Sequence, residues 1–238
     1  FVTAIAITTA FAPAAQALNG KAYLGGGSGI KYGSQAVSAT NTCTLTTIGY
    51  DSSNNLVGIA SGHCPTNAEG VDASWANVSG QTDTDAGTVG TVIYKIYNNT
   101  SPFANWDNTA NKDYAVILFD KTKVVPLKTV GSVTINSISA TSVPFNITVC
   151  KQGRTSGHTC GKVTKTTTQI FDSPLTASGG DSGGPVVAND KLYGAVHGSV
   201  LTFKSFIPVI GTQSLAIKPM LNDIDARGGI GAGFAPVQ

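Results

Sequence analysis

Residues 177–187 read ASGGDSGGPVV, and the fold and function of the whole chain depend on what this stretch is. Four glycines and one proline surround Ser182. Glycine tolerates positive φ and lets backbones approach closely, so a glycine-rich stretch alone is a common turn and weak evidence for chemistry. A serine hydroxyl becomes a useful nucleophile only beside a base that a third group orients. A reactive Ser182 therefore requires a histidine and a carboxylate elsewhere in the chain.

The composition favours an exported, β-rich protein. Charged residues make up 12% of the 238 residues, and the formal net charge is +2. No lysine and arginine cluster exceeds a few residues, which argues against a nucleic-acid surface and a polybasic membrane patch. We therefore expect no nucleic-acid or membrane partner. We also expect no cofactor, no metal and a monomeric protein.

The first 17 residues, FVTAIAITTAFAPAAQA, indicate a secretory signal peptide. They carry no charge and end in Ala15-Gln16-Ala17, the small-x-small pattern of a signal-peptidase site. A buried N-terminal helix is the alternative, while a membrane span is disfavoured because the run is short and broken by Pro13. We expect a signal peptide at residues 1–17 that lacks its basic start, a mature domain at 18–238, and an extracellular, secreted protein.

Four cysteines in an exported chain predict two disulfides. Of the three possible connectivities, the spacing favours Cys43 with Cys64 and Cys150 with Cys160, each of which closes a local loop. Zinc binding by these cysteines is the alternative. It is disfavoured because the chain has no Cys-x-x-Cys and no histidine pair at ligand spacing.

The hydrophobic pattern predicts an all-β fold. Runs such as LVGIA (56–60), YAVILF (114–119) and KLYGAV (191–196) are rich in β-branched or aromatic residues and are bounded by turn-forming residues. Many such strands at close spacing indicate a sandwich or a pair of barrels. One helix is predicted at residues 212–225, where apolar residues recur at helical spacing and Pro219 must be accommodated.

His63 is the best candidate for the base among the three histidines. It stands in IASGHCP, at a strand end held by the predicted Cys64 bridge. His158 lies inside the second predicted disulfide loop, and His197 follows a strand. A single histidine is more often structural than catalytic, so His63 needs partners to support the assignment.

Asp113 is the best candidate for the orienting carboxylate. It opens the apolar strand DYAVILF, where a partly buried carboxylate would need a partner. Asp120 closes the same strand but is followed by two lysines in a solvated turn. His63, Asp113 and Ser182 then follow one another in the chain order of chymotrypsin.

Three segments together resemble the signatures of chymotrypsin-like serine peptidases: SGHC at 61–64, DYAVI at 113–117 and GDSGGP at 180–185. The segment VCKQGRTSGHTCG, residues 149–161, is similar to the disulfide loop of the bacterial alpha-lytic protease and streptogrisin branch. The resemblance extends over about residues 23–225. It implies an all-β fold of two packed six-stranded antiparallel β-barrels with a short C-terminal helix. The N-terminal barrel would occupy about residues 18–120 and the C-terminal barrel about 121–238.

The resemblance implies a secreted serine endopeptidase that acts through an acyl-enzyme. Ser182 would be the nucleophile, His63 the general base and then acid, and Asp113 the group that fixes the imidazole. The backbone N–H groups of Gly180 and Ser182 would form the oxyanion hole.

Asp181 lies next to the nucleophile and is expected to stabilise its loop. In the alpha-lytic branch a basic residue, usually arginine, pairs with the equivalent aspartate, and the matching residue here is Lys151. We therefore expect a Lys151–Asp181 ion pair, with a solvated Lys151 as the alternative. The segment KAYLGGG, residues 21–27, loosely resembles the new N-terminus of trypsin-type enzymes and is a competing partner for Asp181.

The resemblance also suggests which residues bind P1, the substrate side chain just before the cleaved bond. These residues are Thr176, Ala177 and Ser178 on one side and His197, Gly198 and Ser199 on the other. Thr176 stands where trypsin-like members carry an aspartate, which disfavours a basic P1 residue.

His197 departs from the usual serine at its position and leaves two interpretations open. It could donate a hydrogen bond to Asp113 in place of that serine. It could instead recognise an acidic P1 residue, as a histidine near this point does in glutamyl endopeptidases, although the alignment is one residue off and a strand would turn the side chain to the other face. We expect a small or apolar P1 residue, with an acidic residue as the alternative.

Two other function classes remain as alternatives. A catalytically silent binding module with the chymotrypsin fold is one, although such modules usually replace triad residues and this chain replaces none. A structural β-sandwich adhesin would explain the strands but not the serine motif.

Overall fold

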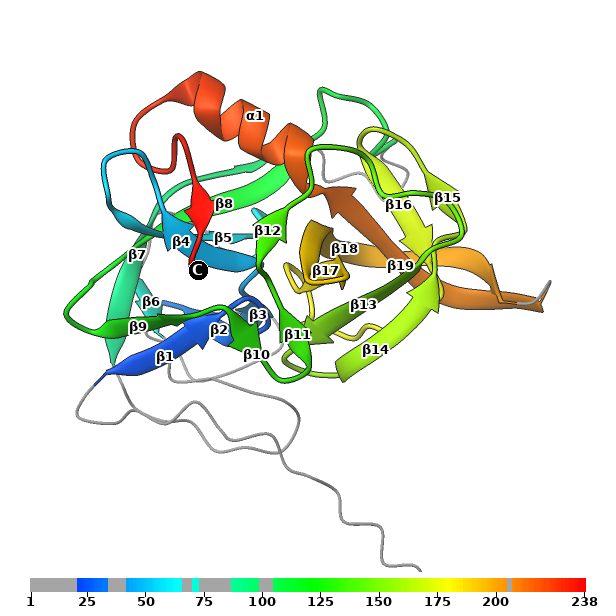
Figure 1. The fold of residues 1–238 in the computed structure, drawn as a ribbon, viewed down its shortest axis with the longest axis horizontal. Helices are drawn as coiled ribbons and strands as arrows, with labels where there is room; N and C mark the ends of the chain where they lie inside the picture. Colours follow the sequence, from blue (N-terminus) through cyan, green and yellow to red (C-terminus); the bar gives the residue numbers. More distant parts are fainter. Residues whose placement is uncertain (1–20, 34–41, 66–69, 73–86, 99–104, 205–206) are drawn as a thin grey trace, which may run out of the picture.

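The computed structural model describes residues 21–33, 42–65, 70–72, 87–98, 105–204 and 207–238. The expected signal peptide at 1–17 lies outside these residues. The described chain consists mainly of antiparallel strands in two large sheets, with one helix packed over them (Figure 1). The prediction of an all-β fold with a single late helix is confirmed.

The first large sheet comes mainly from the N-terminal half of the chain. Its hydrogen-bonded order is β20-β4-β5-β8-β7-β6-β2-β3. The strands are β2 (Gly29–Tyr32), β3 (Thr42–Thr44), β4 (Thr47–Tyr50), β5 (Leu56–Ala60), β6 (Gly70–Asp72), β7 (Thr88–Tyr97), β8 (Asp113–Phe119) and β20 (Ala235–Pro236). Strands β5, β7 and β8 lie side by side, and five consecutive residues of β5 are buried.

The second large sheet is formed by the C-terminal half, in the order β14-β13-β17-β18-β19-β16-β15, with β12 also paired to β18. Its strands are β12 (Ser137–Ile138), β13 (Thr148–Gly153), β14 (Gly157–Lys162), β15 (Lys165–Thr166), β16 (Ile170–Ser173), β17 (Pro185–Ala188), β18 (Lys191–Lys204) and β19 (Ile207–Ala216). Two small sheets pair β1 (Ala22–Gly25) with β9 (Val124–Leu127) and β10 (Thr129–Val130) with β11 (Val133–Thr134). In the described part of the chain each large sheet has eight strands rather than the expected six, because short segments such as β12 and β20 join them.

Helix α1 spans Ile217–Arg227 and is shorter at its start than the predicted 212–225. Residues 212–216 belong instead to β19, where Thr212 pairs with Ser173 of β16. Pro219 falls in the first turn of the helix, where a backbone N–H has no intrahelical acceptor and its loss costs little. Within the described ranges, no helix is long and apolar enough to cross a membrane.

The C-terminal segment packs on the first sheet, although we expected it in the second half of the fold. The buried face of α1 contacts a cluster that includes Val57 and Ile59 of β5 and Tyr114 and Val116 of β8. Val187 and Leu192 of the second sheet belong to the same cluster. The shared apolar core thus joins the two sheets behind Asp113, the first residue of β8.

Shortening a side chain of helix α1 that packs in this core should destabilise the whole molecule. Ile224 is 0% exposed and belongs to the joining cluster, so we expect Ile224→Ala to lower the free energy of unfolding by about 2–5 kcal/mol. Lys218 is exposed on the same helix, and Lys218→Ala should change the free energy of unfolding by no more than about 0.5 kcal/mol. Urea unfolding of the three proteins measures both values. Equal stability of the two variants would contradict the proposed role of this core.

Candidate active site

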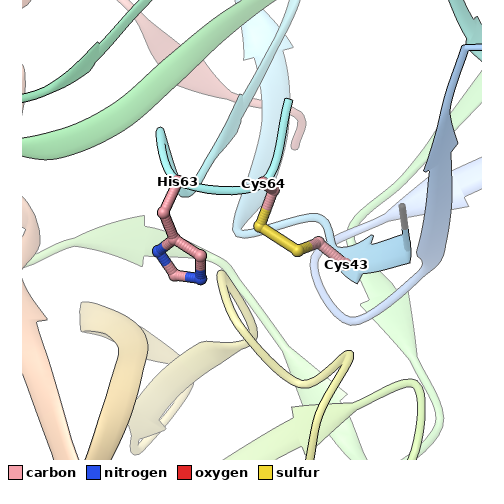
Figure 2. A group of neighbouring side chains, drawn as sticks. All are labelled: Cys43, His63 and Cys64. Carbon is pink, nitrogen blue, oxygen red and sulfur yellow. A yellow bond between two sulfur atoms is a disulfide. The ribbon is translucent and has the colours of Figure 1, made fainter. Parts of the chain in front are cut away.

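His63 lies in the turn that follows β5, beside a disulfide. Cys64 is bonded to Cys43 of β3, and Cys150 is bonded to Cys160, so the structure contains both predicted disulfides. Figure 2 shows the imidazole of His63 beside the Cys43–Cys64 bond. The disulfide ties the turn to β3 and so restricts the backbone position of His63.

Asp113 is the buried centre of the site. Its side chain is 0% exposed, and its Oδ1 accepts a hydrogen bond from the backbone N–H of His63 at 2.8 Å. Its Oδ2 lies 2.7 Å from Nδ1 of His63 and 2.6 Å from Nδ1 of His197. Burial by itself would raise the pKa of Asp113, but the hydrogen bonds from His197 and His63 lower it well below its usual range. The carboxylate is therefore anionic and faces two imidazoles.

An aromatic stack covers the second imidazole. The ring of His197 lies against Trp106, with 4.1 Å between the ring centroids. Trp106 in turn stacks on Tyr97, at 6.0 Å and an interplanar angle of 8°. Tyr97 also lies 5.6 Å from the ring of His63. Sequence reasoning did not identify Trp106 or Tyr97, because an isolated aromatic residue carries no periodic signal.

The loop that carries Ser182 packs closely against the turn that carries His63. Gly183 adopts φ = 83°, and a Cβ atom there would lie 2.3 Å from the carbonyl oxygen of Thr44 and 3.2 Å from the backbone nitrogen of Ser61. The backbone N–H of Thr44 donates to the carbonyl of Ser182 at 2.9 Å. The carbonyl of Val196, which precedes His197, accepts hydrogen bonds from Gly183 at 2.8 Å and from the Ser61 hydroxyl at 3.5 Å. The segments bearing Ser182, His63 and His197 thus meet at one carbonyl group.

The backbone N–H groups of this loop fall into two sets. Those of Asp181, Gly183 and Gly184 donate to backbone carbonyls at 2.8–2.9 Å. Those of Gly180 and Ser182 donate to no acceptor among the described residues. Gly180 has φ = 95°, and a Cβ atom there would lie 2.6 Å from Oγ1 of Thr155. Glycine is therefore favoured at 180 for its backbone conformation, which other side chains rarely adopt.

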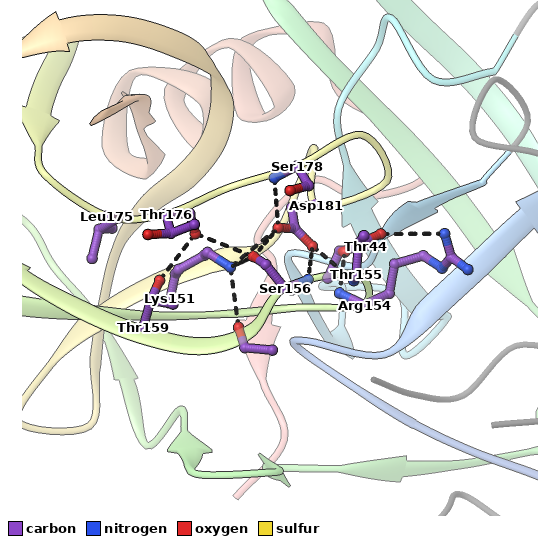
Figure 3. A network of polar contacts seen from close by, with 12 residues as sticks. Thr44, Lys151, Arg154, Thr155, Ser156, Thr159, Leu175, Thr176, Ser178 and Asp181 are labelled. Atoms are coloured by element: carbon purple, nitrogen blue, oxygen red, sulfur yellow. Dashed lines mark hydrogen bonds and ion pairs between the residues drawn. The ribbon is translucent and has the colours of Figure 1, made fainter. Parts of the chain in front are cut away.

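A buried ion pair links Asp181, in the loop that carries Ser182, to Lys151 of β13 (Figure 3). Lys151 and Asp181 are both 0% exposed, and Nζ of Lys151 lies 3.2 Å from Oδ2 of Asp181. Asp181 also accepts hydrogen bonds from the backbone N–H groups of Thr155, Ser156 and Ser178 at 2.8, 3.1 and 3.0 Å. The hydroxyl of Ser156 donates to it as well.

The charge state of this pair follows from its hydrogen bonds. Burial would raise the pKa of Asp181, but the hydrogen bond from Ser156 and the positive charge of Lys151 hold it below its usual value. Burial lowers the pKa of Lys151, and the carboxylate opposes that shift. The cation beside Asp181 is therefore the side-chain ammonium of Lys151. Ala22–Gly25, part of the competing segment, lies elsewhere, in β1 paired with β9.

The residues expected to bind P1 form the exposed side of the site. Thr176, Ser178 and Ser199 are exposed, whereas Ala177, His197 and Gly198 are half-buried. The carbonyl of Thr176 accepts hydrogen bonds from the hydroxyls of Ser156 and Thr159, both at 3.1 Å. A separate cavity of about 320 Å³ lies between Trp106, Asp113 and helix α1, and the expected P1 residues do not line it.

Removal of the buried lysine should damage both the loop and the stability of the fold. We expect Lys151→Ala to lower the free energy of unfolding by about 3–5 kcal/mol, because it leaves the Asp181 carboxylate buried without its counter-charge. Lys162 is exposed on the neighbouring strand β14, so Lys162→Ala serves as the matched control with a change within about 0.5 kcal/mol. Chemical unfolding measures both. A Lys151→Ala protein as stable as the control would show that the pair does not support the loop.

No protein-family model matches the chain, and no curated protein sequence matches it significantly. Solved structures do match over most of its length. Thermobifida fusca protease A has a TM-score of 0.58 at 19% identity, with 91% of this chain and 100% of that chain covered. Cellulomonas bogoriensis chymotrypsin has a TM-score of 0.54 at 20% identity, covering 90% and 98%.

The same fold also occurs in a protein described as inactivated. A scabies mite inactivated protease paralogue has a TM-score of 0.51 at 14% identity, with 90% of this chain and 100% of that chain covered. Identities this low establish a common fold and leave activity to be argued from the site. The chain has the chymotrypsin-like fold of bacterial serine proteases.

Proposed function

We propose that the protein is a serine endopeptidase that hydrolyses peptide bonds through an acyl-enzyme, with Ser182, His63 and Asp113 as its catalytic triad. The observation that carries this proposal is the contact of one buried, anionic carboxylate, that of Asp113, with both the backbone N–H and the ring Nδ1 of His63. That geometry fixes the orientation and the tautomer of the imidazole, which is what a general base requires.

The mechanism follows from where the proton of His63 resides. Because Asp113 Oδ2 accepts at Nδ1, the neutral imidazole keeps its proton there and presents a lone pair at Nε2. Nε2 would take the hydroxyl proton of Ser182 as Oγ attacks the carbonyl carbon of the substrate, and would then give that proton to the leaving amine. Water would hydrolyse the resulting ester by the same steps, which releases the acid and restores the Ser182 hydroxyl.

The negative oxygen that develops during the attack needs nearby donors. The N–H groups of Gly180 and Ser182 donate to no acceptor among the described residues and are proposed to form the oxyanion hole. Loss of one such donor typically lowers the rate by about 10²- to 10³-fold. The buried Lys151–Asp181 pair would hold these donors in place before substrate binds.

A catalytically silent binding module is the second candidate, because an inactivated paralogue shares the fold. The residues of this chain favour the peptidase: the serine, the histidine and the carboxylate are all present, and the last two are in contact. Two disulfides further support secretion, since such bonds persist mainly in oxidising compartments.

We propose that the enzyme prefers a small or apolar P1 residue. His197 is the one imidazole among the residues expected to bind P1, and its Nδ1 contacts Asp113. Its ring is also held against Trp106. Thr176 supplies no charge for a basic P1 residue.

An active-site probe tests the proposed nucleophile. A fluorophosphonate should label the wild-type protein covalently, and Ser182→Ala should remove the labelling because the attacking oxygen is gone. Ser132 is exposed on the turn between β10 and β11, so Ser132→Ala should label like the wild type. Labelling is read by intact mass. A folded wild-type protein that takes up no probe would favour the silent binding module.

The two interpretations of His197 differ in substrate dependence. As a donor to Asp113, His197 should affect all substrates alike, so His197→Ala is expected to lower kcat by about 10- to 100-fold for peptides with either alanine or glutamate at P1. His197→Ser, which restores a hydroxyl donor, should recover part of the loss. Steady-state kinetics on matched peptides measures the effect. A loss confined to glutamate substrates would instead assign His197 to acidic recognition.

A further inference from the structure

Three groups of side chains bring potential metal ligands together in the described residues. Two of them, around Cys43 and around Cys150, rely on sulfur atoms that are already bonded to each other in disulfides. A disulfide sulfur is not a thiolate and is a poor ligand for zinc. In the third group, His63, Asp113 and His197, the ligand atoms are joined only by hydrogen bonds, which a metal ion can replace.

We propose that His63, Asp113 and His197 form a Zn²⁺ site whose occupation inhibits the enzyme. The inhibitory effect rests on the proposed peptidase function, whereas the binding of the metal does not. Two imidazole nitrogens and one carboxylate oxygen make a ligand set found in catalytic zinc sites, with a water in the fourth position. Zn²⁺ suits the site because it has no geometric preference from d-electrons and accepts nitrogen and oxygen ligands.

The distances are close to those a zinc ion needs. Nδ1 of His63 and Nδ1 of His197 lie 2.7 and 2.6 Å from the same carboxylate oxygen. Tetrahedral zinc with bonds of about 2.0–2.2 Å places its ligand atoms about 3.3–3.6 Å apart. Each imidazole therefore has to move outward by about 0.6–1.0 Å for the ion to replace the two shared protons.

Charge and access both favour a cation at this point. Asp113 is buried and anionic, and in the described ranges its side chain forms hydrogen bonds and ion pairs with the two histidines and with no lysine or arginine. A buried carboxylate with neutral donors as its neighbours attracts a small cation strongly. The side chains of His63 and His197 are 25% and 13% exposed, so solvent reaches the outer edge of the site.

Zinc binding would remove the general base without breaking a covalent bond. Each neutral imidazole must give its Nδ1 lone pair to the metal, so its single proton moves through solvent from Nδ1 to Nε2. Nε2 of His63 then carries a hydrogen and cannot accept the proton of Ser182. The effect depends on His197, since a serine hydroxyl at that position would be a poor third ligand.

Metal binding can be measured on a protein that has no turnover. Untagged Ser182→Ala protein, titrated with Co²⁺ as a spectroscopic probe, should develop visible absorption that Zn²⁺ then displaces, and calorimetry gives the Zn²⁺ affinity. Adding His197→Gln keeps an N–H donor for Asp113 but removes a ligand, and should weaken binding by at least about 100-fold, the upper limit for loss of a mere second-shell partner. His158 is exposed and outside the group, so Ser182→Ala with His158→Gln should bind as before.

Several outcomes decide the proposal. No binding by the folded Ser182→Ala protein, or binding lost with His158→Gln but kept with His197→Gln, overturns the site. In the wild-type enzyme, Zn²⁺ should inhibit peptide hydrolysis, EDTA should restore it, and the residual activity of His197→Gln should be insensitive to Zn²⁺. Metal binding without any hydrolysis by the metal-free wild type would refute the peptidase and leave the site standing.

Discussion

The burial of the Asp113 carboxylate is the constraint around which the rest of the site is arranged. A charge with no exposed surface is tolerated only if hydrogen-bond donors replace water, because the desolvation penalty is several kcal/mol. Three N–H groups meet that requirement, two from His63 and one from His197. They come from the turn after β5 and from β18, so the carboxylate fixes both large sheets at one point. The apolar cluster under α1 holds β8 from the other side.

Asp181 is a second buried carboxylate, with a different kind of environment. Its partners are backbone N–H groups, a hydroxyl and the ammonium of Lys151. The partners of Asp113 are the imidazoles of His63 and His197 and the backbone N–H of His63. Both carboxylates are held ionised, so the difference lies in their neighbours. One site supports a backbone conformation, and the other supports a side chain suited to proton transfer.

Residues with a strong local pattern were predictable from the sequence, and residues placed by tertiary contacts were not. The glycines around Ser182 and the apolar strand after Asp113 indicate the loop and the buried carboxylate directly. Residues 212–216 were predicted as helix because apolar residues from Leu215 onward recur at helical spacing, but pairing with β16 makes them strand. The glycine-rich tail, residues 226–238, indicates a loop or an edge segment but not its partner, since β4, which pairs with β20, lies far away in the sequence. The role of Trp106 was unpredictable for the same reason, because only folding brings Trp106 next to His197.

The presence of an imidazole at position 197 requires more than a hydrogen bond to explain it. A hydroxyl could donate to Asp113 equally well, as the serine usual at this position in the family suggests. The imidazole adds a flat ring that packs against Trp106 and continues the stack to Tyr97, next to His63. It also adds a second nitrogen ligand beside the carboxylate. The packing constrains the ring while its Nδ1 remains directed at Asp113, so the feature that steadies the proposed triad is also the one that makes it open to a metal ion.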